Sequence, residues 1–312
     1  MIPPVRPLGD FPLSRSALDR DQLSRSADGF VAAALTDPRS RIVRLGAGRM
    51  RVRQNALVLE QVSEADAAEA GSAVYLGRTV DDDGDIDAGT PILLLASAEA
   101  GDDDERTGVQ WLSPRDMAHL LSDRDAGIAS EAAAVAAWHR SSRFCSNCGT
   151  ETVVRNAGWM RACPNCGVDH FPRTDPAVIV RIVHDDRILL GSSALWPEGR
   201  YSLLAGFVEA GESIEAAVLR EVEEESGMRL ASPTYLGSQP WPFPRSLMLG
   251  YHAELAPDQD PDAISRDEEE LDDVRWFSRE ELLASDSRVT LPGPTSIARA
   301  IIDDWLRGDE RQ

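Results

Sequence analysis

The run Arg220–Glu225 contains one arginine and four glutamates, residue types that can bind divalent cations and transfer protons. We expect this run to lie on a helix that begins after Ser213, a suitable N-cap, and ends at Gly227, a typical C-terminal glycine. On such a helix Glu221 and Glu225 are one turn apart, with Cβ atoms about 5–6 Å from each other. The two carboxylates could therefore share one or two metal ions.

The apolar stripe of this predicted helix consists of Ile214, Ala217, Val218, Val222 and Met228. At about 100° per residue, Glu221 and Glu225 fall inside the stripe, whereas Glu224 lies at its margin. Glu223 points the opposite way and is interpreted as a solvated residue. An ionised carboxylate on a core-facing stripe is destabilising unless its charge is compensated, and Mg²⁺ or Mn²⁺ prefers such oxygen ligands. We therefore interpret Glu221 and Glu225 as metal ligands; a plain surface helix is the alternative.

All four cysteines occur in one short segment as two Cys-x2-Cys pairs, Cys145/Cys148 and Cys163/Cys166. Four thiolates suit a tetrahedral zinc ion and leave no coordination position for water, so we interpret the zinc as structural. A redox dithiol is one alternative, but no thioredoxin-like βαβ pattern surrounds the pairs. A nucleic-acid-binding ribbon is another, although few basic residues lie nearby: Arg143, Arg155, Arg161 and Arg173. His170 is interpreted as a packing or pocket residue rather than a fifth ligand.

The 312-residue chain is strongly acidic, with a net charge of −21, and each of its 32 basic residues is an arginine. Such a chain is a poor general binder of nucleic acid, whose affinity depends largely on neutralising phosphates. Any phosphate ligand must therefore be held locally by arginine, backbone N–H groups or divalent cations. No apolar stretch is long enough to cross a bilayer, and Met1–Arg6 contains no hydrophobic segment of a secretory signal. We expect a cytoplasmic protein with no membrane contact.

Residues 1–126 are expected to form a small β-rich N-terminal domain, antiparallel and without catalytic residues. Its expected strands are Arg41–Leu45, Ala56–Glu60, Val74–Arg78 and Pro91–Ala96. Two helical stretches, Ser113–Leu121 and the alanine-rich Ala129–Ser141, come next, and the second belongs to a linking helix at 127–142. The zinc ribbon is then expected at 143–172.

Residues 173–312 are expected to form the last domain, in which strands and helices are mixed. Its expected strands are Ala177–Val183, Ile188–Gly191, Tyr201–Leu204, Tyr235–Gln239 and Leu247–Leu255, and its closing helix is Thr295–Leu306. A turn at Asp185 and Asp186 would join the first two strands. This mixture favours an α/β sandwich of the α+β class over a parallel Rossmann sheet.

Residues 206–228 resemble the Nudix box, G-x5-E-x7-R-E-U-x-E-E-x-G-U with U apolar, at every specified position. The resemblance implies an α/β/α Nudix sandwich that hydrolyses a nucleoside diphosphate linked to another group. It implies that Glu221, Glu224 and Glu225 carry the metals or the attacking water. It also makes the carbonyl of Ala205, just before the box, a further metal ligand.

Ten residues after the box, Ser238–Ser246 contains three prolines interleaved with two aromatic residues. Such a segment is stiff and extended and could form one side of a pocket for a planar base; a proline-rich connector is the alternative. The segment is similar throughout to the S-Q-P-W-P-F-P-x-S signature of the NADH pyrophosphatase (NudC-type) subgroup of Nudix hydrolases. The four-cysteine ribbon, Phe171-Pro172-Arg173-x-Asp175-Pro176 and the box follow that subgroup's order. The resemblance covers 140–312 well and 1–110 only in general layout.

The subgroup resemblance implies a set of substrate contacts. Phe171 would stack on a base, although relatives have a tyrosine there whose hydroxyl contact is lost, and Phe207 would offer a second aromatic face. Ala298 would make a backbone contact to substrate, whereas Gly158 lacks the substrate-contacting glutamate of some relatives. Glu270 corresponds to a distal metal-binding glutamate, in a register that the surrounding acidic run makes less certain. The remaining implied substrate residues are Gln239, Pro240, Trp241, Pro242, Phe243, Pro244, Arg245 and Ser246.

The resemblance implies hydrolysis of NADH or NAD⁺ to (reduced) nicotinamide mononucleotide and AMP, with catalytic Mg²⁺ or Mn²⁺ and one structural Zn²⁺. NAD-capped RNA, whose 5′ end has the same linkage, is a further implied substrate, and a homodimer is the implied assembly. One alternative is a Nudix hydrolase for ADP-ribose or a diadenosine polyphosphate, against which the proline–aromatic segment argues. Another is a zinc-ribbon binding module whose Nudix domain is only a sensor, which the intact carboxylates of the box disfavour. The preference among NADH, NAD⁺ and capped RNA stays open.

Overall fold

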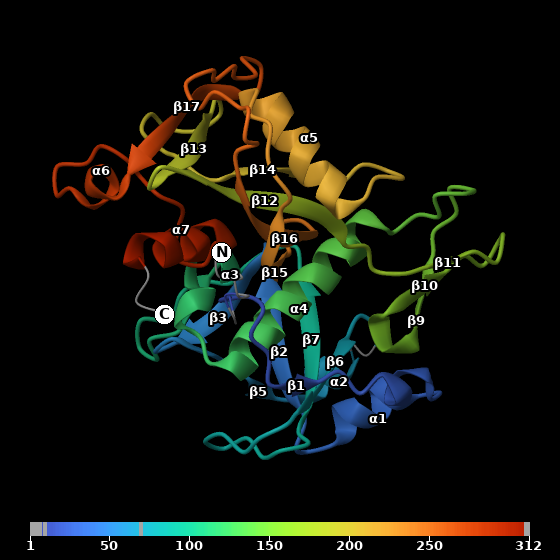
Figure 1. Cartoon of the computed structure of the whole chain (residues 1–312). Helices are drawn as coiled ribbons and strands as arrows, with labels where there is room; N and C mark the ends of the chain where they lie inside the picture. The colour runs from blue at the N-terminus through green and yellow to red at the C-terminus, as the bar shows by residue number, and fades with distance from the viewer. Residues whose placement is uncertain (1–7, 9–10, 69–70, 309–312) are drawn as a thin grey trace. The chain divides into compact units, whose positions relative to one another are not determined.

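The computed structural model describes residues 8, 11–68 and 71–308 (Figure 1), and the chain divides into two compact units. The C-terminal unit comprises the described residues of Met1–Pro12, Asp175–Pro240 and Ser246–Gln312. The N-terminal unit comprises Leu13–Thr174 together with Trp241–Arg245. A short part of the proline–aromatic segment therefore belongs to the N-terminal unit, although the residues on both sides of it belong to the other unit.

The C-terminal unit contains one sheet, built from β12 (Asp175–His184), β13 (Arg187–Ser193), β14 (Leu204–Phe207), β15 (Thr234–Trp241), β16 (Ser246–Glu254) and β17 (Leu271–Ser278). The strand order is β15-β16-β12-β13-β17, with β14 paired to β12. β12 and β16 are parallel, whereas β12 and β17 are both antiparallel to β13. Positive φ angles at Asp185 and Asp186 make the expected turn between β12 and β13. The strand expected at Tyr201–Leu204 was placed too early, because pairing with β12 begins only at Leu204.

Helices pack on both faces of this sheet: α5 (Ile214–Ser226) on one and α7 (Ile297–Arg307) on the other (Figure 1). Successive side chains of a strand point to opposite faces, so a strand covered on both sides is continuously apolar. On β12 the side chains that share the α5 core are Val178, Val180 and Ile182, whereas Ile179 packs in the α7 core. The short α6 (Arg279–Leu283) follows β17. This arrangement confirms the expected α/β/α sandwich.

The sheet of the N-terminal unit is built from β1 (Leu18–Asp19), β2 (Arg41–Gly46), β3 (Arg49–Arg53), β4 (Ala56–Leu57), β5 (Glu60–Gln61), β6 (Val74–Thr79), β7 (Pro91–Ser97) and β8 (Gln110–Leu112). Its order is β1-β6-β7-β2-β3-β4, with β5 on β2 and β8 on β3. The expectation of an antiparallel domain is wrong at β2 and β7, which pair in parallel. The alternation of side chains along a strand does not reveal the direction of a partner that is distant in sequence. The expected strand at Ala56–Glu60 is divided between β4 and β5.

The helices of the N-terminal unit are η1 (Gln22–Ser26), α1 (Phe30–Thr36), α2 (Glu64–Ala68), α3 (Pro114–Met117), η2 (Ala118–Leu120) and α4 (Asp123–Ser141). α4 begins earlier than expected because Ser122 caps it, its side chain accepting a hydrogen bond from the Asp125 N–H at 3.2 Å. The cysteine segment forms a separate sheet of β9 (Val153–Arg155), β10 (Met160–Ala162) and β11 (Asp169–His170), with the turn η3 (Asn156–Gly158). No helix among the described residues combines the length and apolar character needed to cross a membrane.

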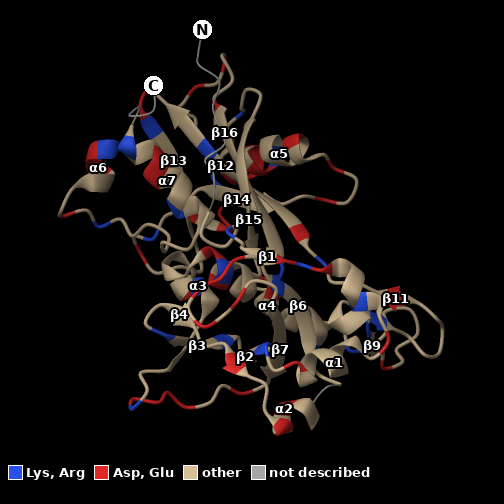
Figure 2. Cartoon of the chain, turned by 90° about the horizontal axis from the view of Figure 1, so that it is seen from below, with Lys and Arg blue, Asp and Glu red and all other residues tan. Residues whose placement is uncertain are grey.

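Acidic residues are scattered over loops and helix surfaces, including those of α2 and α5 (Figure 2), but Glu131 of α4 is buried. Its carboxylate lies 3.7 Å from the guanidinium of Arg20 and 3.9 Å from that of Arg25. Its Oε1 has no hydrogen-bond partner among the described residues. Burial raises the pKa of Glu131 from 4.5 to about 7, although the two arginines lower it. Below about pH 7 the folded protein therefore keeps this carboxyl group mainly protonated.

We expect the substitution Glu131→Gln to stabilise the folded protein relative to the wild type, and to do so more strongly as pH rises. Because the pKa is raised, the free energy of unfolding of the wild type falls as pH rises from 4.5 to about 7, and it stays at the lower value above that range. A neutral amide avoids this loss, which is on the order of 3 kcal/mol. The difference in Tm between variant and wild type should therefore grow by several degrees from pH 5.5 to pH 8 in thermal unfolding. A difference that shrinks instead would mean that Arg20 and Arg25 stabilise the charged form.

Candidate active site and zinc site

The four cysteine side chains converge from two turns, one before β9 and one between β10 and β11. Their Sγ atoms all lie within 4.8 Å of one another, and among the described residues no other group of Cys, His, Asp or Glu converges as tightly. The glycine after each pair has a φ of +74° and donates its N–H to the carbonyl of that pair's first cysteine. Two matching turns thus present four sulfur donors to one point, which suits tetrahedral zinc. The structure supports the expected structural zinc site.

His170, on β11, borders the zinc site. Its Nε2 lies 3.3 Å from the Sγ of Cys145, a distance suited to a hydrogen bond to a thiolate. Such a contact orients a ligand that the zinc already has. Arg161, one of the few basic residues of the segment, is buried and donates to the hydroxyl and carbonyl of Thr152. Arg161 therefore serves the fold and is not available to a nucleic acid.

Helix α5 begins and ends at the expected capping residues. Ser213 accepts a hydrogen bond from the Ala216 N–H at 3.2 Å, and Gly227, with φ of 70°, donates to the Glu223 carbonyl at 2.8 Å. The stripe residues Ala217, Val218, Val222 and Met228 are fully buried. Glu223 is exposed, as expected for the opposite face. The helix is therefore oriented as its apolar stripe predicts.

Arg220 connects the loop of the box to α5. Its Nε and Nη2 each donate to the Glu212 carboxylate at 2.8 Å, and Nη2 also donates to the Phe207 carbonyl at 3.0 Å. Its Nη1 lies 2.8 Å from Glu224 and 3.0 Å from Glu221. The hydrogen bonds from Arg220 hold the pKa of Glu212 well below its usual range, at about 2. This two-point ion pair fixes the loop against the helix.

Glu225 is the most buried carboxylate of the box, with 8% of its surface exposed. Its Oε2 has no hydrogen-bond partner among the described residues. Burial, followed by the negative charges of Glu221 and Glu270, raises the pKa of Glu225 to about 8, although a backbone hydrogen bond at Ala205 lowers it. A buried carboxylate beside two others needs a positive charge, and a divalent cation would supply it.

Glu221 lies against β14 at Gly206. A Cβ atom at Gly206 would be 2.0 Å from the Cδ atom of Glu221, so only glycine allows the carboxylate to approach the strand this closely. Glu221 is half-buried, and burial is the largest influence that raises its pKa. The charges of Glu224 and Glu270 raise this pKa further, whereas Arg220 lowers it. The absence of a side chain at Gly206 thus allows the carboxylate of Glu221 to lie between α5 and β14.

The structure places four of the expected metal-binding residues in one neighbourhood of the C-terminal unit: Ala205, Glu221, Glu225 and Glu270. Glu224 is exposed at the margin and is engaged with Arg220. Asp267 also raises the pKa of Glu225 and was not anticipated. Within an acidic run, nothing in the sequence indicates which members face the helix.

The expected substrate residues of the C-terminal unit differ in exposure. Phe207 presents an aromatic side chain that is 59% exposed, and Pro240 and Ser246 are half-buried. Gln239 is fully buried, and its Nε2 donates to the Thr295 carbonyl at 3.1 Å. Ala298 is buried in the first turn of α7. The Gln239 amide thus joins β15 to the segment before α7, and its contact with substrate stays a prediction.

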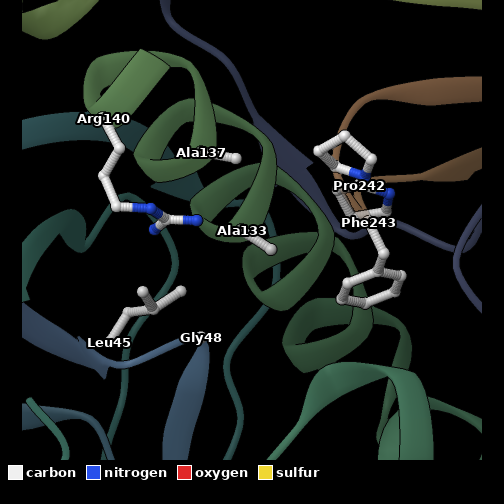
Figure 3. Close-up of a pocket in the computed structure, with 8 residues that line it drawn as sticks. Leu45, Gly48, Ala133, Ala137, Arg140, Pro242 and Phe243 are labelled. Atoms are coloured by element: carbon white, nitrogen blue, oxygen red, sulfur yellow. The ribbon is translucent and has the colours of Figure 1, made fainter. Parts of the chain in front are cut away.

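The expected substrate residues of the N-terminal unit include Trp241–Arg245, which packs on the β-rich domain. Pro242, Phe243 and Pro244 form one side of a pocket of about 270 Å³ (Figure 3). The Trp241 and Phe243 rings meet edge to face, with centroids 5.1 Å apart. The segment therefore does border a pocket, and its first part, as far as Trp241, is the end of strand β15.

Phe171 and Gly158 also lie in the N-terminal unit. The Phe171 ring is 58% exposed and offers a free aromatic face. Gly158 has a φ of +97°, and a Cβ atom there would be 2.6 Å from Val74 Cγ1. The glutamate that some relatives have at this position would therefore not fit without movement of the neighbouring strand.

Two family models match the chain: the NUDIX domain at residues 173–294 and the NADH pyrophosphatase zinc ribbon domain at residues 140–171. The chain is 37% identical over 303 residues to the NAD-capped RNA hydrolase NudC of Mycobacterium bovis (strain BCG / Pasteur 1173P2), covering 93% of each chain. Identity and coverage are the same for the protein of that name from Mycobacterium tuberculosis (strain ATCC 25618 / H37Rv). With that of Pseudomonas aeruginosa (strain LESB58) the identity is 41% over 222 residues, covering 70% of this chain and 74% of the other.

A sheet with helices on both faces, carboxylates on the inner side of α5 and a four-cysteine ribbon together define a hydrolase of the Nudix class with an attached zinc site. The chain belongs to the Nudix hydrolase family, in its NADH pyrophosphatase (NudC-type) subgroup. The mycobacterial matches extend across nearly the whole chain, including the N-terminal unit, where the motifs alone indicated only a general layout.

We expect the substitution Cys163→Ser to remove zinc and to destabilise the N-terminal unit. Cys163 is buried, and structural zinc contributes directly to folding because the ligands are brought together only in the folded state. Zinc content by elemental analysis and Tm by calorimetry should both fall. The matched control is Val168→Ala, an exposed position beside the second pair, which should retain zinc. Full zinc content in the serine variant would contradict the four-cysteine assignment.

We expect Gly206→Ala to weaken binding of Mn²⁺ by about tenfold or more while the protein remains folded. The added methyl group would collide with the Glu221 carboxylate and push it away from β14. Mn²⁺ titration followed by electron paramagnetic resonance measures the affinity, and circular dichroism checks the fold. Gly293→Ala, where the added atom meets open space, is the control. Unchanged Mn²⁺ affinity in the Gly206 variant would exclude Glu221 as a ligand.

Proposed function

We propose that this chain hydrolyses the pyrophosphate bond of NADH and NAD⁺ to (reduced) nicotinamide mononucleotide and AMP, and that it removes NAD caps from RNA 5′ ends. The observation that carries the proposal is the buried Glu225, whose Oε2 has no hydrogen-bond partner in the described part of the chain and whose carboxyl group lies beside the charges of Glu221 and Glu270. The name of the relatives, NAD-capped RNA hydrolase, supports the substrate class.

Ala205, through its carbonyl, and the carboxylates of Glu221, Glu225 and Glu270 would hold Mg²⁺ or Mn²⁺. When bound, such cations neutralise the pyrophosphate oxygens and lower the pKa of water. The need for them is strong here, because a chain of net charge −21 otherwise repels a polyphosphate. Arg220 pairs with Glu212 and Glu224 and also contacts Glu221, whereas the Oε2 of Glu225 has no partner among the described residues and is left for a cation.

Glu221, Glu224 and Glu225 are the candidates to accept the proton of the attacking water. Glu225 is the best acceptor, because burial raises its pKa and none of the described residues is a hydrogen-bond partner of its Oε2. Glu224 is exposed and engaged with Arg220, which favours a role at the edge of the site. We therefore assign proton transfer to Glu225 Oε2, in addition to the place of Glu225 among the residues that would hold the cations, and we assign Glu221 to cation binding alone.

Exposed aromatic rings would bind the two bases of the dinucleotide. Phe207 and Phe171 each have more than half of their surface exposed, and bases stack readily on such rings. The proline–aromatic segment and the backbone of Ala298 would complete the binding site. We further propose a homodimer in the cytoplasm as the working form, in keeping with the family resemblance.

Glu225→Gln should lower kcat for NADH by at least about 100-fold, because the amide can neither accept a proton nor balance a cation. Release of AMP in the presence of Mg²⁺ or Mn²⁺, followed by chromatography, measures the rate. Glu223→Gln, two positions away on the exposed face, is the matched control and should retain wild-type turnover. Wild-type turnover in the Glu225 variant would exclude the proposed role.

A side-by-side kinetic comparison tests the substrate class. NADH, NAD⁺ and NAD-capped RNA should be cleaved with higher kcat/KM than ADP-ribose or a diadenosine polyphosphate. Binding of NADH without release of AMP under any of these conditions would favour a sensor over an enzyme.

A further inference from the structure

A loop of the C-terminal unit, residues 194–200, presents apolar side chains to solvent beside the carboxylate site. Leu195 is 92% exposed and Trp196 is 37% exposed. At the start of the loop the N–H of Ala194 donates to the Glu270 carbonyl at 3.1 Å. Glu270 is one of the expected metal-binding residues, and its charge acts on the inner carboxylates of α5. The loop therefore continues the edge of the site where the cations would bind.

The loop is held at both ends, so its exposed side chains have a fixed position. The strand before it, β13, pairs with β17 (Figure 1) and has a register shift between Ser192 and Ser193. An irregularity of this kind bends the strand and redirects the chain that follows. At the other end the N–H of Thr290 donates to the Gly199 carbonyl at 2.7 Å. The loop is thus ordered before a ligand binds, which lowers the entropic cost of binding.

Trp196 and Arg200 combine an aromatic ring with a positive charge. The guanidinium carbon of Arg200 lies over the Trp196 ring, 5.1 Å from its centroid. Arg288, whose carbonyl oxygen lies against Gly199, is an exposed arginine next to the loop, and Glu198 is the one acidic residue of the loop. Bases of a single strand stack on aromatic rings whatever their sequence, and arginine neutralises the phosphates between them. The pair therefore has the chemistry of a contact to single-stranded nucleic acid.

The position of the loop favours RNA over other occupants. NADH and NAD⁺ end at their two bases, whereas NAD-capped RNA continues from the adenosine ribose as a single strand. That strand has to leave the carboxylate site across one of its edges, and residues 194–200 form such an edge. In a chain of net charge −21, attraction to RNA has to come from local contacts of this kind.

We propose that residues 194–200 form a subsite for the RNA that follows the cap. Trp196 stacks on a base, Leu195 packs beside it, and Arg200 binds a phosphate. The subsite rests on the proposed function, because it concerns the substrate of the same carboxylate site. It makes Trp196 a residue that distinguishes capped RNA from free NADH.

Trp196→Ala should lower kcat/KM for NAD-capped RNA about tenfold through a higher KM, the loss expected for one stacked base. The value for NADH, which has no strand, should be unchanged. Trp196→Phe keeps a ring and should recover most of the loss. Leu283→Ala, at an apolar residue of α6 that is 65% exposed, is the control and should match the wild type with both substrates. Equal losses for NADH and capped RNA, or no loss for capped RNA, would overturn the proposal.

Binding to the Glu225→Gln protein separates the subsite from the proposed hydrolysis. Fluorescence anisotropy of a labelled NAD-capped RNA in Mg²⁺ measures affinity without turnover, so it decides on the subsite even if the wild type cleaves neither substrate. Adding Trp196→Ala should weaken binding about tenfold. Unchanged affinity would overturn the proposal. A change of assembly in sedimentation would do so too, because the loop would then join copies of the chain.

The salt dependence of the same binding tests Arg200. Adding Arg200→Gln should reduce the slope of affinity against salt concentration, because one phosphate contact is lost. Arg106→Gln, at a side chain that is 94% exposed in the N-terminal unit, makes the same change in net charge and should leave the slope unchanged. Equal slopes in the two variants would remove Arg200 from the subsite and overturn its proposed contact.

Discussion

Repulsion between inward-facing carboxylates is the constraint on which the C-terminal unit depends. The apolar stripe of α5 packs the helix on the sheet, and the same orientation carries Glu225 into a buried position beside Glu221 and Glu270. Within the part of the chain that the structure describes, the Oε2 of Glu225 has no hydrogen-bond partner and Glu225 has no arginine in an ion pair. The packing that stabilises the helix therefore creates an acidic site that favours a proton or a divalent cation.

The carboxylates of the box are positioned in two ways. Arg220 pairs with Glu212 and Glu224 and so ties the loop to the outer side of the helix. On the inner side, Gly206 removes the side chain that would keep Glu221 away from β14. Arg220 thus holds Glu212 and Glu224 on the outer side and also contacts Glu221, while Gly206 lets Glu221 reach the inner side beside Glu225. The hydrolase chemistry we propose depends on this arrangement.

The N-terminal unit brings together parts that serve different purposes. Its cysteine segment is organised by four sulfurs around one point, because so short a sheet has little apolar core of its own. This unit also includes the segment Trp241–Arg245, which in the sequence links β15 and β16 of the other unit. This segment places Pro242–Pro244 against small side chains of α4 and leaves a cavity in which Arg140 is the single charge.

Local features of the sequence were sufficient for much of this molecule. Ser213 and Gly227 determined the ends of α5, the 3.6-residue period determined that Glu225 is buried and Glu223 exposed, and the spacing of the cysteines determined the zinc site. The tertiary structure alone decided that β2 and β7 are parallel, that Asp267 joins Glu225, and that α4 faces Pro242–Pro244. Helix caps, the helical period and the spacing of ligands involve residues that are close in sequence. The short chain between such residues restricts how they can be arranged. Contacts between distant segments depend on how whole elements pack, and no pattern within either segment specifies its partner.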